Sequence, residues 1–366
     1  MPGSELLRRA LARAGVQDVA RWDGSALVAA GDALLLLRAD HVFDAALVAG
    51  LRQSPGVLLR RPEDGLPVAA HLPRTTAPRD AAAVAAALDT GRGAEDPAFA
   101  ELRPTAPDDL SGAYNKALRK RGSAYLLPLA PETRRDAEWR MFGGSYKGVT
   151  DFVTKHVWPI PAFHVVRACA ALGITPNMVT SASLVLVFAA LWWFAQGAWL
   201  PGLLAAWVMT FLDTVDGKLA RVTLTSTKFG NLFDHLIDLI HPPFWWLAWI
   251  MGCAAAGMPL AHPTAVGAVI VGGYVLQRLL EGLFQLQHGM HIHVWRPFDS
   301  VFRQVIARRN PNLVLLTAAT LFGRPDLGIL AVAAWTAFGC VEQAVVAAQA
   351  AVARRRDVPL RSWLEG

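Results

Sequence analysis

Four aspartates at helical spacing are the residues of this chain best suited to chemistry. Asp213 and Asp216 are three residues apart, and Asp234 and Asp238 are four apart, so each pair shares one face of an α-helix. The residues between them are largely Val, Leu, Phe and Ile, which an alternative of four solvated surface acids does not explain. Carboxylates in apolar sequence need neutralising cations, and hard oxygen ligands suit Mg²⁺ or Mn²⁺. We therefore expect two helices to face each other across a divalent metal site.

Small residues and one arginine accompany these acids. Gly217 and Ala220 stand on the first helix and Gly230 on the second, which leaves room for close approach of a nucleotide. Arg221 follows Gly217 by four residues and can offer a bidentate fork to phosphate oxygens; the alternative is a charge anchor at the membrane surface. Two metal ions about 3.5–4 Å apart can clamp the attacking and leaving oxygens of a displacement. Such a site would suit phosphoryl transfer, which needs mainly positioning and charge stabilisation.

The complete segment resembles the signature of the CDP-alcohol phosphotransferases, also called CDP-alcohol phosphatidyltransferases. It reads Asp-x-x-Asp-Gly-x-x-Ala-Arg over residues 213–221, then eight residues, then Gly-x-x-x-Asp-x-x-x-Asp over residues 230–238. In that family of integral membrane enzymes, a CDP-linked alcohol donates its phosphoryl-alcohol part to an acceptor hydroxyl and CMP is released. The resemblance implies that the four aspartates hold two Mg²⁺ or Mn²⁺ ions, that Asp238 is also the base, and that the protein is a homodimer. His235 is a competing base.

The composition is that of a membrane protein. Hydrophobic residues make up 54% of the chain and charged residues 17%, and mean hydropathy is +0.33, outside the usual soluble balance. A spanning helix needs about 20 apolar residues. We expect six such helices in an all-α membrane domain, the second and fifth continuing into polar sequence, at residues 178–197, 199–213, 232–257, 263–284, 312–322 and 327–352.

Basic residues alternate between the segments that connect these spans. They gather between the second and third spans, between the fourth and fifth, and in the tail, whereas the other connections hold one arginine at most. This pattern places both termini and the carboxylates on the cytoplasmic side, and residues 1–21 are too polar for a cleavable signal. We therefore expect an integral protein of a bacterial inner membrane, with membrane lipids as partners and no nucleic acid.

A juxtamembrane segment precedes the first span. Residues 146–173 mix basic and apolar side chains, as in a helix that lies in the interface, with Trp158-Pro159 as a break or an anchor; the alternative is an ordinary linker. Thr175 is expected to cap the first span, with Pro176 in its first turn. The expected domains are an interfacial helix and linker at 141–175, a membrane domain at 176–356 and a cytoplasmic tail at 357–366.

Residues 1–140 are expected to form a small cytoplasmic α/β domain. The pattern predicts a buried strand at 26–37, a helix at 41–51, a hairpin of 56–60 with 66–71, a helix at 81–88 and a loop at 105–109. Residues 36–44 resemble the mid-sheet segment of sugar-nucleotidyltransferases, in which an Asp holds the metal. The Gly-rich triphosphate loop is missing before Asp40. We expect a catalytically inactive remnant with Asp40 as a structural residue; the alternative is a bifunctional enzyme that also makes the CDP-alcohol.

Basic side chains near the carboxylates are candidates for binding a phosphate on the acceptor; the alternative for them is anchoring by lipid phosphates. They are Lys228, Arg303, Arg308 and Arg309. Three nearby histidines are spaced for Zn²⁺ but lack a completing ligand, so headgroup contacts are favoured; they are His288, His291 and His293. Arg278 and Glu281, within the fourth span, are functional suspects or mutual partners.

Two weaker resemblances point to different substrates. Residues 147–155 and 175–180 look like the inositol-phosphate-using branch of the family, but Leu239 follows Asp238 where that branch commonly has Arg. Phe233-Asp234-His235 instead looks like the choline and ethanolamine phosphotransferases, which act on a lipid hydroxyl. We favour a phosphorylated alcohol as acceptor. A non-catalytic transporter or scaffold is disfavoured because all four acids and Arg221 are intact.

Overall fold

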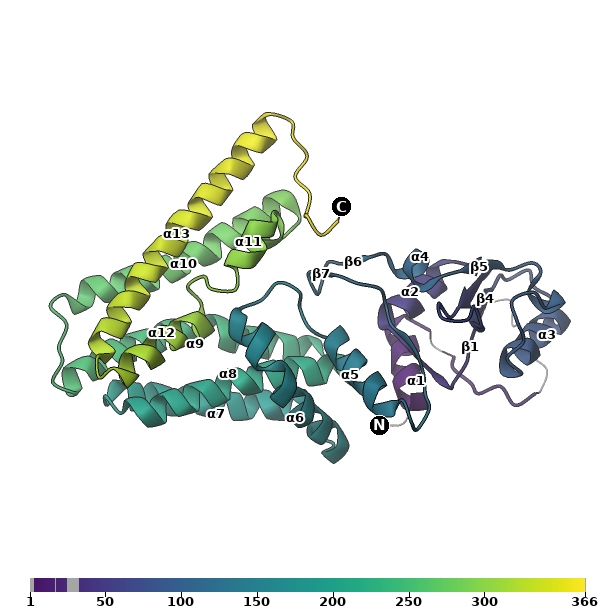
Figure 1. Cartoon of the computed structure of the whole chain (residues 1–366), viewed down its shortest axis with the longest axis horizontal. Coiled ribbons are helices and arrows are strands. Elements are labelled where there is room, and N and C mark those ends of the chain that lie inside the picture. The colour runs from purple at the N-terminus through teal and green to yellow at the C-terminus, as the bar shows by residue number, and fades with distance from the viewer. Residues whose placement is uncertain (1–2, 17, 25–32, 366) are drawn as a thin grey trace. The chain divides into compact units, whose positions relative to one another are not determined.

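The computed structural model describes residues 3–16, 18–24 and 33–365 of the 366-residue chain (Figure 1). These residues form two compact units. The first comprises the described residues of Met1–Asn115, Arg121–Tyr146 and Val222–Leu224. The second comprises the described residues of Lys116–Lys120, Lys147–Arg221 and Thr225–Gly366.

The first unit is built on a four-stranded sheet of order β1-β4-β3-β5. Strand β4 pairs antiparallel with β1 and β3, and β5 pairs parallel with β3. Because side chains alternate between the faces of a strand, Leu59 joins the apolar cluster of α1 and α2, while Leu58 joins that of α3. The strands are β1 (Leu34–Leu37), β3 (Val57–Arg60), β4 (Pro67–Leu72) and β5 (Arg103–Thr105), and the helices are α1 (Gly3–Arg13), α2 (Ala45–Gln53) and α3 (Pro78–Asp89).

The expected α/β character and the hairpin of 56–60 with 66–71 are confirmed in this unit, and α3 contains the expected helix at 81–88. The expected helix at 41–51 is partly wrong. Its first residues form β2 (His41–Phe43), which pairs with β8 (Leu126–Pro128), and α2 begins only after Asp44, whose side chain caps it by accepting from the Ala46 amide at 2.9 Å. A β-branched residue and an aromatic favour a strand there, and Asp favours an N-cap.

The expected loop at 105–109 is also wrong, because β5 ends at Thr105 and a short helix, α4 (Pro107–Ser111), follows. Of the expected strand at 26–37, Leu34–Leu37 is confirmed and residues 25–32 lie outside the described part. The remaining elements of the chain up to residue 144 are η1 (Pro97–Phe99), β6 (Tyr114–Asn115), β7 (Lys120–Arg121) and α5 (Arg134–Gly144).

The second unit is helical. Its apolar core is centred on Trp245, Trp246 and Trp249 of α9. The Trp245 indole donates to the Val187 carbonyl at 2.9 Å and the Trp249 indole to the Pro325 carbonyl at 3.0 Å, so buried aromatic side chains tie α9 to α7 and to the start of α13. Helices α10 and α13 run alongside each other (Figure 1). The long helices are α7 (Pro176–Ala195), α8 (Trp199–Val222), α9 (Lys228–Ala255), α10 (Pro263–His288), α12 (Arg309–Leu321) and α13 (Pro325–Arg355).

The juxtamembrane segment is helical and breaks where expected. A π-helical turn, η2 (Val153–Val157), precedes α6 (Pro159–Leu172), and the junction falls at Trp158-Pro159. The Thr175 hydroxyl accepts from the Met178 amide at 3.3 Å, which confirms the predicted cap of α7. Two short helices complete the unit, η3 (Ile292–Val294) and α11 (Pro297–Phe302).

Every expected span corresponds to a helix of the structure. Within the described residues, three helices are long and apolar enough to cross a membrane: Pro176–Ala195, Pro263–His288 and Pro325–Arg355. Helix α12 has 13 residues, or about 20 Å at 1.5 Å per residue, against about 30 Å of hydrocarbon. The chain therefore contains a largely helical, membrane-type unit and a small α/β unit, and the count of six spans stays a prediction.

Candidate active site

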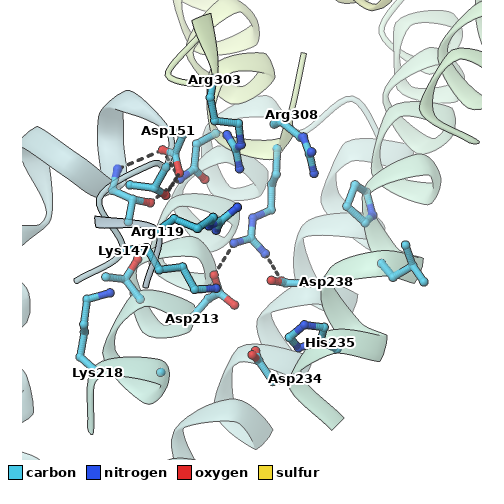
Figure 2. A pocket seen from close by; sticks show the side chains of 18 of the residues that line it. Arg119, Lys147, Asp151, Asp213, Lys218, Asp234, His235, Asp238, Arg303 and Arg308 are labelled. Atoms are coloured by element: carbon cyan, nitrogen blue, oxygen red, sulfur yellow. Dashed lines mark hydrogen bonds and ion pairs between the residues drawn. The ribbon is translucent and has the colours of Figure 1, made fainter. Parts of the chain in front are cut away.

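A cavity of about 360 Å³ opens among the helices of the second unit (Figure 2). Helix α8 contributes Asp213 and Gly217, helix α9 contributes Asp234 and Asp238, and helix α10 contributes Tyr274. Three further stretches of chain complete the wall, with the side chains of Arg119, of Lys147, Thr150, Asp151 and Thr154, and of Arg303, Arg308, Arg309 and Asn310. Segments distant in sequence thus meet at the predicted carboxylates.

Three of the four aspartates form a compact oxygen cluster. One carboxylate oxygen each of Asp213, Asp216 and Asp234 lies within 4.8 Å of the others. Asp216 is 3% exposed; its Oδ2 accepts from the Thr180 hydroxyl of α7 at 2.5 Å, and its Oδ1 has no hydrogen-bond partner among the described residues. A buried carboxylate oxygen without a donor is costly. The donor set and this unsatisfied atom both fit a divalent cation, which carboxylate oxygens readily coordinate.

Asp238 joins the cluster through an arginine. The Arg309 guanidinium binds Asp238 with Nη1 and Asp213 with Nη2, so that one side chain bridges α8 and α9 (Figure 2). The side chain of Asp238 is 42% exposed, whereas that of Asp213 is 18% exposed. A substrate in the cavity thus reaches Asp238 more readily than Asp213.

Basic side chains surround the carboxylates. Burial first, and then the charges of Arg119 and Arg221, lower the pKa of Lys147 to about 8, against the opposing effect of Asp213 and Asp234. The cavity wall holds eight Lys and Arg but only four Asp. An excess of cations in a partly enclosed cavity attracts anions, so the wall suits phosphate groups.

Asp151 ties the juxtamembrane segment to the start of α12. Its Oδ1 accepts from the Thr154 amide at 3.0 Å and from the Asn310 side chain at 2.9 Å. Burial alone would raise the pKa of Asp151, but the Arg303 charge and these hydrogen bonds outweigh it and the pKa is lowered. This contact holds one wall of the cavity next to Arg309.

A second polar network lies behind the cavity and is centred on Glu281. Its Oε1 accepts from Arg278 at 3.0 Å, from His293 at 3.2 Å and from Gln343 at 2.9 Å, and also from Arg308. The expected partnership of Arg278 and Glu281 is therefore confirmed. His293 is engaged by Glu281, and in the described part of the chain the three histidines do not form a metal-type cluster.

Residues 173–308 match the family model described as CDP-alcohol phosphatidyltransferase. This segment is a CDP-alcohol phosphatidyltransferase domain. The chain is also similar to a curated relative, archaetidylinositol phosphate synthase of Pyrococcus horikoshii, with 28% identity over 184 residues that cover 49% of this chain and 87% of that protein. The family resemblance seen in the sequence is thus confirmed. The matched domain contains all four aspartates, whereas Arg309 and residues 1–172 lie outside it.

Most predicted site residues of the domain line the cavity. Gly217, Arg221, His235, Arg303 and Arg308 do so together with the aspartates, and Asp216 lies buried in the adjoining cluster. Besides Asp216, three predicted residues are not among the lining residues: Ala220, Lys228 and Gly230. A Cβ at Gly230 would lie 2.6 Å from Oδ1 of Asn177 and 3.1 Å from Oγ1 of Thr227, so packing against α7 and the cap of α9 already requires glycine there.

Several residues that line the cavity, in the CDP-alcohol phosphatidyltransferase domain and its flanks, were not predicted as site residues from the sequence. Lys218 falls within the signature at a variable position, and helical spacing from Thr214 and Arg221 could have placed it on the same face. Asp151 and Asn310 carry no local signal because they meet across 159 residues. Lys147 was assigned to the interfacial segment, and Arg119 to no site at all.

Proposed function

We propose that this protein moves a phosphoryl-alcohol group from a CDP-alcohol to an acceptor hydroxyl, with release of CMP, in phospholipid biosynthesis. The observation that carries the proposal is the cluster of Asp213, Asp216 and Asp234 beside a cavity lined by cations, inside a matched CDP-alcohol phosphatidyltransferase domain. Phosphoryl transfer requires carboxylates that hold metal ions and cationic side chains that hold phosphates.

The three clustered aspartates would hold the divalent ions, with Asp238 completing the set for two Mg²⁺ or Mn²⁺. When bound, these ions would neutralise the diphosphate and the leaving CMP oxygen. The buried Oδ1 of Asp216, which lacks a donor among the described residues, supports this assignment.

The side chains of the cavity then have distinct tasks. Gly217 leaves space beside Arg221, whose Nη2 atom lies 3.1 Å from the position that a Cβ at residue 217 would take, so that a phosphate can reach the guanidinium. Asp238 takes the proton of the acceptor hydroxyl; the acceptor oxygen bonds to the phosphorus that carries the alcohol, and the bond from that phosphorus to the CMP oxygen breaks. Arg309 donates a hydrogen bond to Asp238, so Asp238 acts once Arg309 has turned to a substrate phosphate.

The acceptor that the cavity suits best is a phosphorylated alcohol of the inositol phosphate type. Lys and Arg outnumber Asp in the cavity wall, and Arg303, Arg308 and Arg309 are among them. The relative named archaetidylinositol phosphate synthase agrees with this choice. The second candidate is a lipid hydroxyl with a choline-type or ethanolamine-type donor, which the Phe233-Asp234-His235 sequence favours.

We propose six membrane spans, a cavity open to the cytoplasm of a bacterial cell, a homodimer and an inactive N-terminal remnant. Helices α8 and α9 have 24 and 28 residues, long enough to span by length. The alternation of basic connecting segments supports the orientation, and the missing triphosphate loop supports the remnant.

The test is CMP release by purified protein in lipid nanodiscs with Mg²⁺ or Mn²⁺. One arm offers a CDP-linked lipid with inositol phosphate, or with unphosphorylated inositol as the matched control; the other offers CDP-choline or CDP-ethanolamine with diacylglycerol. We expect CMP release only from the CDP-linked lipid with inositol phosphate. Release with diacylglycerol alone would select the second candidate, and no release from any CDP-alcohol would refute phosphoryl-alcohol transfer.

A further inference from the structure

A loop far upstream of the family match supplies a residue of the cavity wall. Residues Lys116–Lys120, which run from the end of β6 to the first residue of β7, belong to the second unit although the chain on both sides belongs to the first. Arg119 of this loop lines the cavity with Lys147 and Arg303, and Figure 2 shows its side chain among theirs. Arg119 thus adds to the candidate site a residue that the sequence analysis did not include.

The loop is held against the juxtamembrane segment by close backbone contact. The Gly148 amide donates to the Leu118 carbonyl at 2.8 Å. A Cβ at Gly148 would lie 2.6 Å from both the Arg119 carbonyl oxygen and the Lys120 Cβ, so only glycine permits this approach. The loop position is thus built into the fold by a residue immediately beside Lys147.

The backbone of Arg119 is in the left-handed region, with φ of 50°. This conformation disfavours residues that carry a Cβ, and arginine has no short polar side chain to offset it locally. Strained residues of this kind persist where the surrounding structure holds them, often at binding sites. Arginine in place of glycine or asparagine here indicates that its side chain has a task.

The surroundings of the guanidinium point to an anion. Arg119 faces a cavity whose wall already carries Lys147, Arg303 and Arg309, and its charge contributes to lowering the pKa of both Lys147 and His291. Eight Lys and Arg share this wall with four Asp, so an anionic ligand would reduce the remaining repulsion between the cations. Phosphate is the anion of the proposed reaction, and a guanidinium matches its geometry.

We propose that Arg119 binds a phosphate group of a substrate, so that the segment before the matched domain supplies part of the binding site. This rests on the proposed function. The ligand is either the diphosphate of the CDP-alcohol or the phosphate of the acceptor alcohol, which share the chemistry that an arginine recognises.

The test compares three full-length variants by steady-state CMP release. Arg119→Asn removes the guanidinium and tolerates the left-handed backbone, so its thermal stability is expected to equal or exceed that of the wild type. Arg119→Lys keeps the charge, and Arg121→Ala on the same ribbon is the matched control outside the cavity wall. We expect Arg119→Asn to raise KM for one substrate by about 10- to 100-fold, Arg119→Lys to raise it less, and Arg121→Ala to leave it unchanged.

The affected substrate identifies the ligand. A higher KM for the CDP-alcohol assigns Arg119 to the donor diphosphate, and a higher KM for inositol phosphate assigns it to the acceptor. Gly148→Ala, which displaces the loop, should reproduce the same defect, while Gly143→Ala, which has open space around its Cβ, should not. Unchanged KM values for both substrates in Arg119→Asn would overturn the proposal.

The test of Arg119 can be separated from the test of the proposed function. If the wild type releases no CMP, the proposed function fails, and Arg119 is then judged by calorimetric binding of CDP and of inorganic phosphate in the presence of Mg²⁺. Equal affinities of wild type and Arg119→Asn for both anions would overturn the assignment of Arg119 as well.

Discussion

Arg309 donates to the Asp238 carboxylate at 2.5 Å, from the start of α12 to the middle of α9. The same guanidinium binds Asp213, so the residue proposed as the base and a proposed metal ligand share one internal cation. A guanidinium and a divalent ion seek the same oxygens. Arg309 therefore competes with metal ions for the site.

Replacing Arg309 by Gln is expected to tighten Mn²⁺ binding while slowing transfer. Removing charge-assisted bonds of about 1.5–3 kcal/mol leaves Asp213 and Asp238 open to the ion, so the Kd for Mn²⁺ should fall about 10-fold or more. Electron paramagnetic resonance of free Mn²⁺ measures it without substrates. An unchanged Kd would mean that the Arg309 bridge does not compete with the ion in solution.

Chelation should abolish transfer, because the clustered carboxylates cannot bind a diphosphate unaided. EDTA is expected to stop CMP release, and Mg²⁺ or Mn²⁺ to restore it. Asp216→Asn should weaken Mn²⁺ binding, since Asp216 is buried and its Oδ1 has no other partner among the described residues. Asp326→Asn, in the first turn of α13 and away from the cavity, is the control. Full activity in EDTA would exclude metal dependence.

Asp238→Asn should lower kcat by at least about 100-fold, the contribution typical of a general base. It should leave CDP-alcohol bound more tightly than Asp213→Asn does, because Asp213 belongs to the three-carboxylate cluster and Asp238 does not. His235, exposed at the cavity wall, is the rival base. Normal turnover of Asp238→Asn together with loss in His235→Ala would reverse the assignment.

Helical spacing in the sequence predicts the aspartates of this site, but it does not predict the residues that long-range contacts bring to the cavity. Asp213, Asp216 and Asp234 lie within one or two turns of their signature partners, so helical periodicity alone places each on the correct face. Arg119 and Asp151 reach the cavity through contacts over many residues, which periodicity does not encode. In the first unit, His41–Phe43 became a strand because it pairs with Leu126–Pro128, a partner that no window around residue 41 contains.

Substrate binding should weaken as the pH rises through about 8. Burial lowers the pKa of Lys147 to about 8, so the cation is present below that pH and is lost above it. If Lys147 holds a substrate phosphate, KM should rise above pH 8 by up to about 10-fold per unit of pH, the limit for loss of one proton. Lys147→Arg keeps its charge throughout and should flatten the profile of KM against pH. An identical profile in both proteins would remove Lys147 from the binding site.

Replacing Asp40 by Ala tests whether the N-terminal domain is a catalytically inactive remnant. In the first unit Asp40 accepts from Arg38 at 2.7 and 3.0 Å and from His41 at 2.7 Å, and the Arg38 hydrogen bond first, then His41, lowers the pKa of Asp40. A lowered carboxyl pKa adds stability above the unfolded value of about 3.9, and that stability is lost as the pH falls towards the folded value. The Asp40 side chain is 52% exposed, so the loss at pH 7 should stay below about 1 kcal/mol. Asp64→Ala, which removes the exposed ion pair between Asp64 and Arg61, is the matched control for thermal denaturation.

Both variants should release CMP at the wild-type rate. Synthesis of a CDP-alcohol from CTP and a phosphorylated alcohol, lost only in Asp40→Ala, would instead establish two enzymes in one chain.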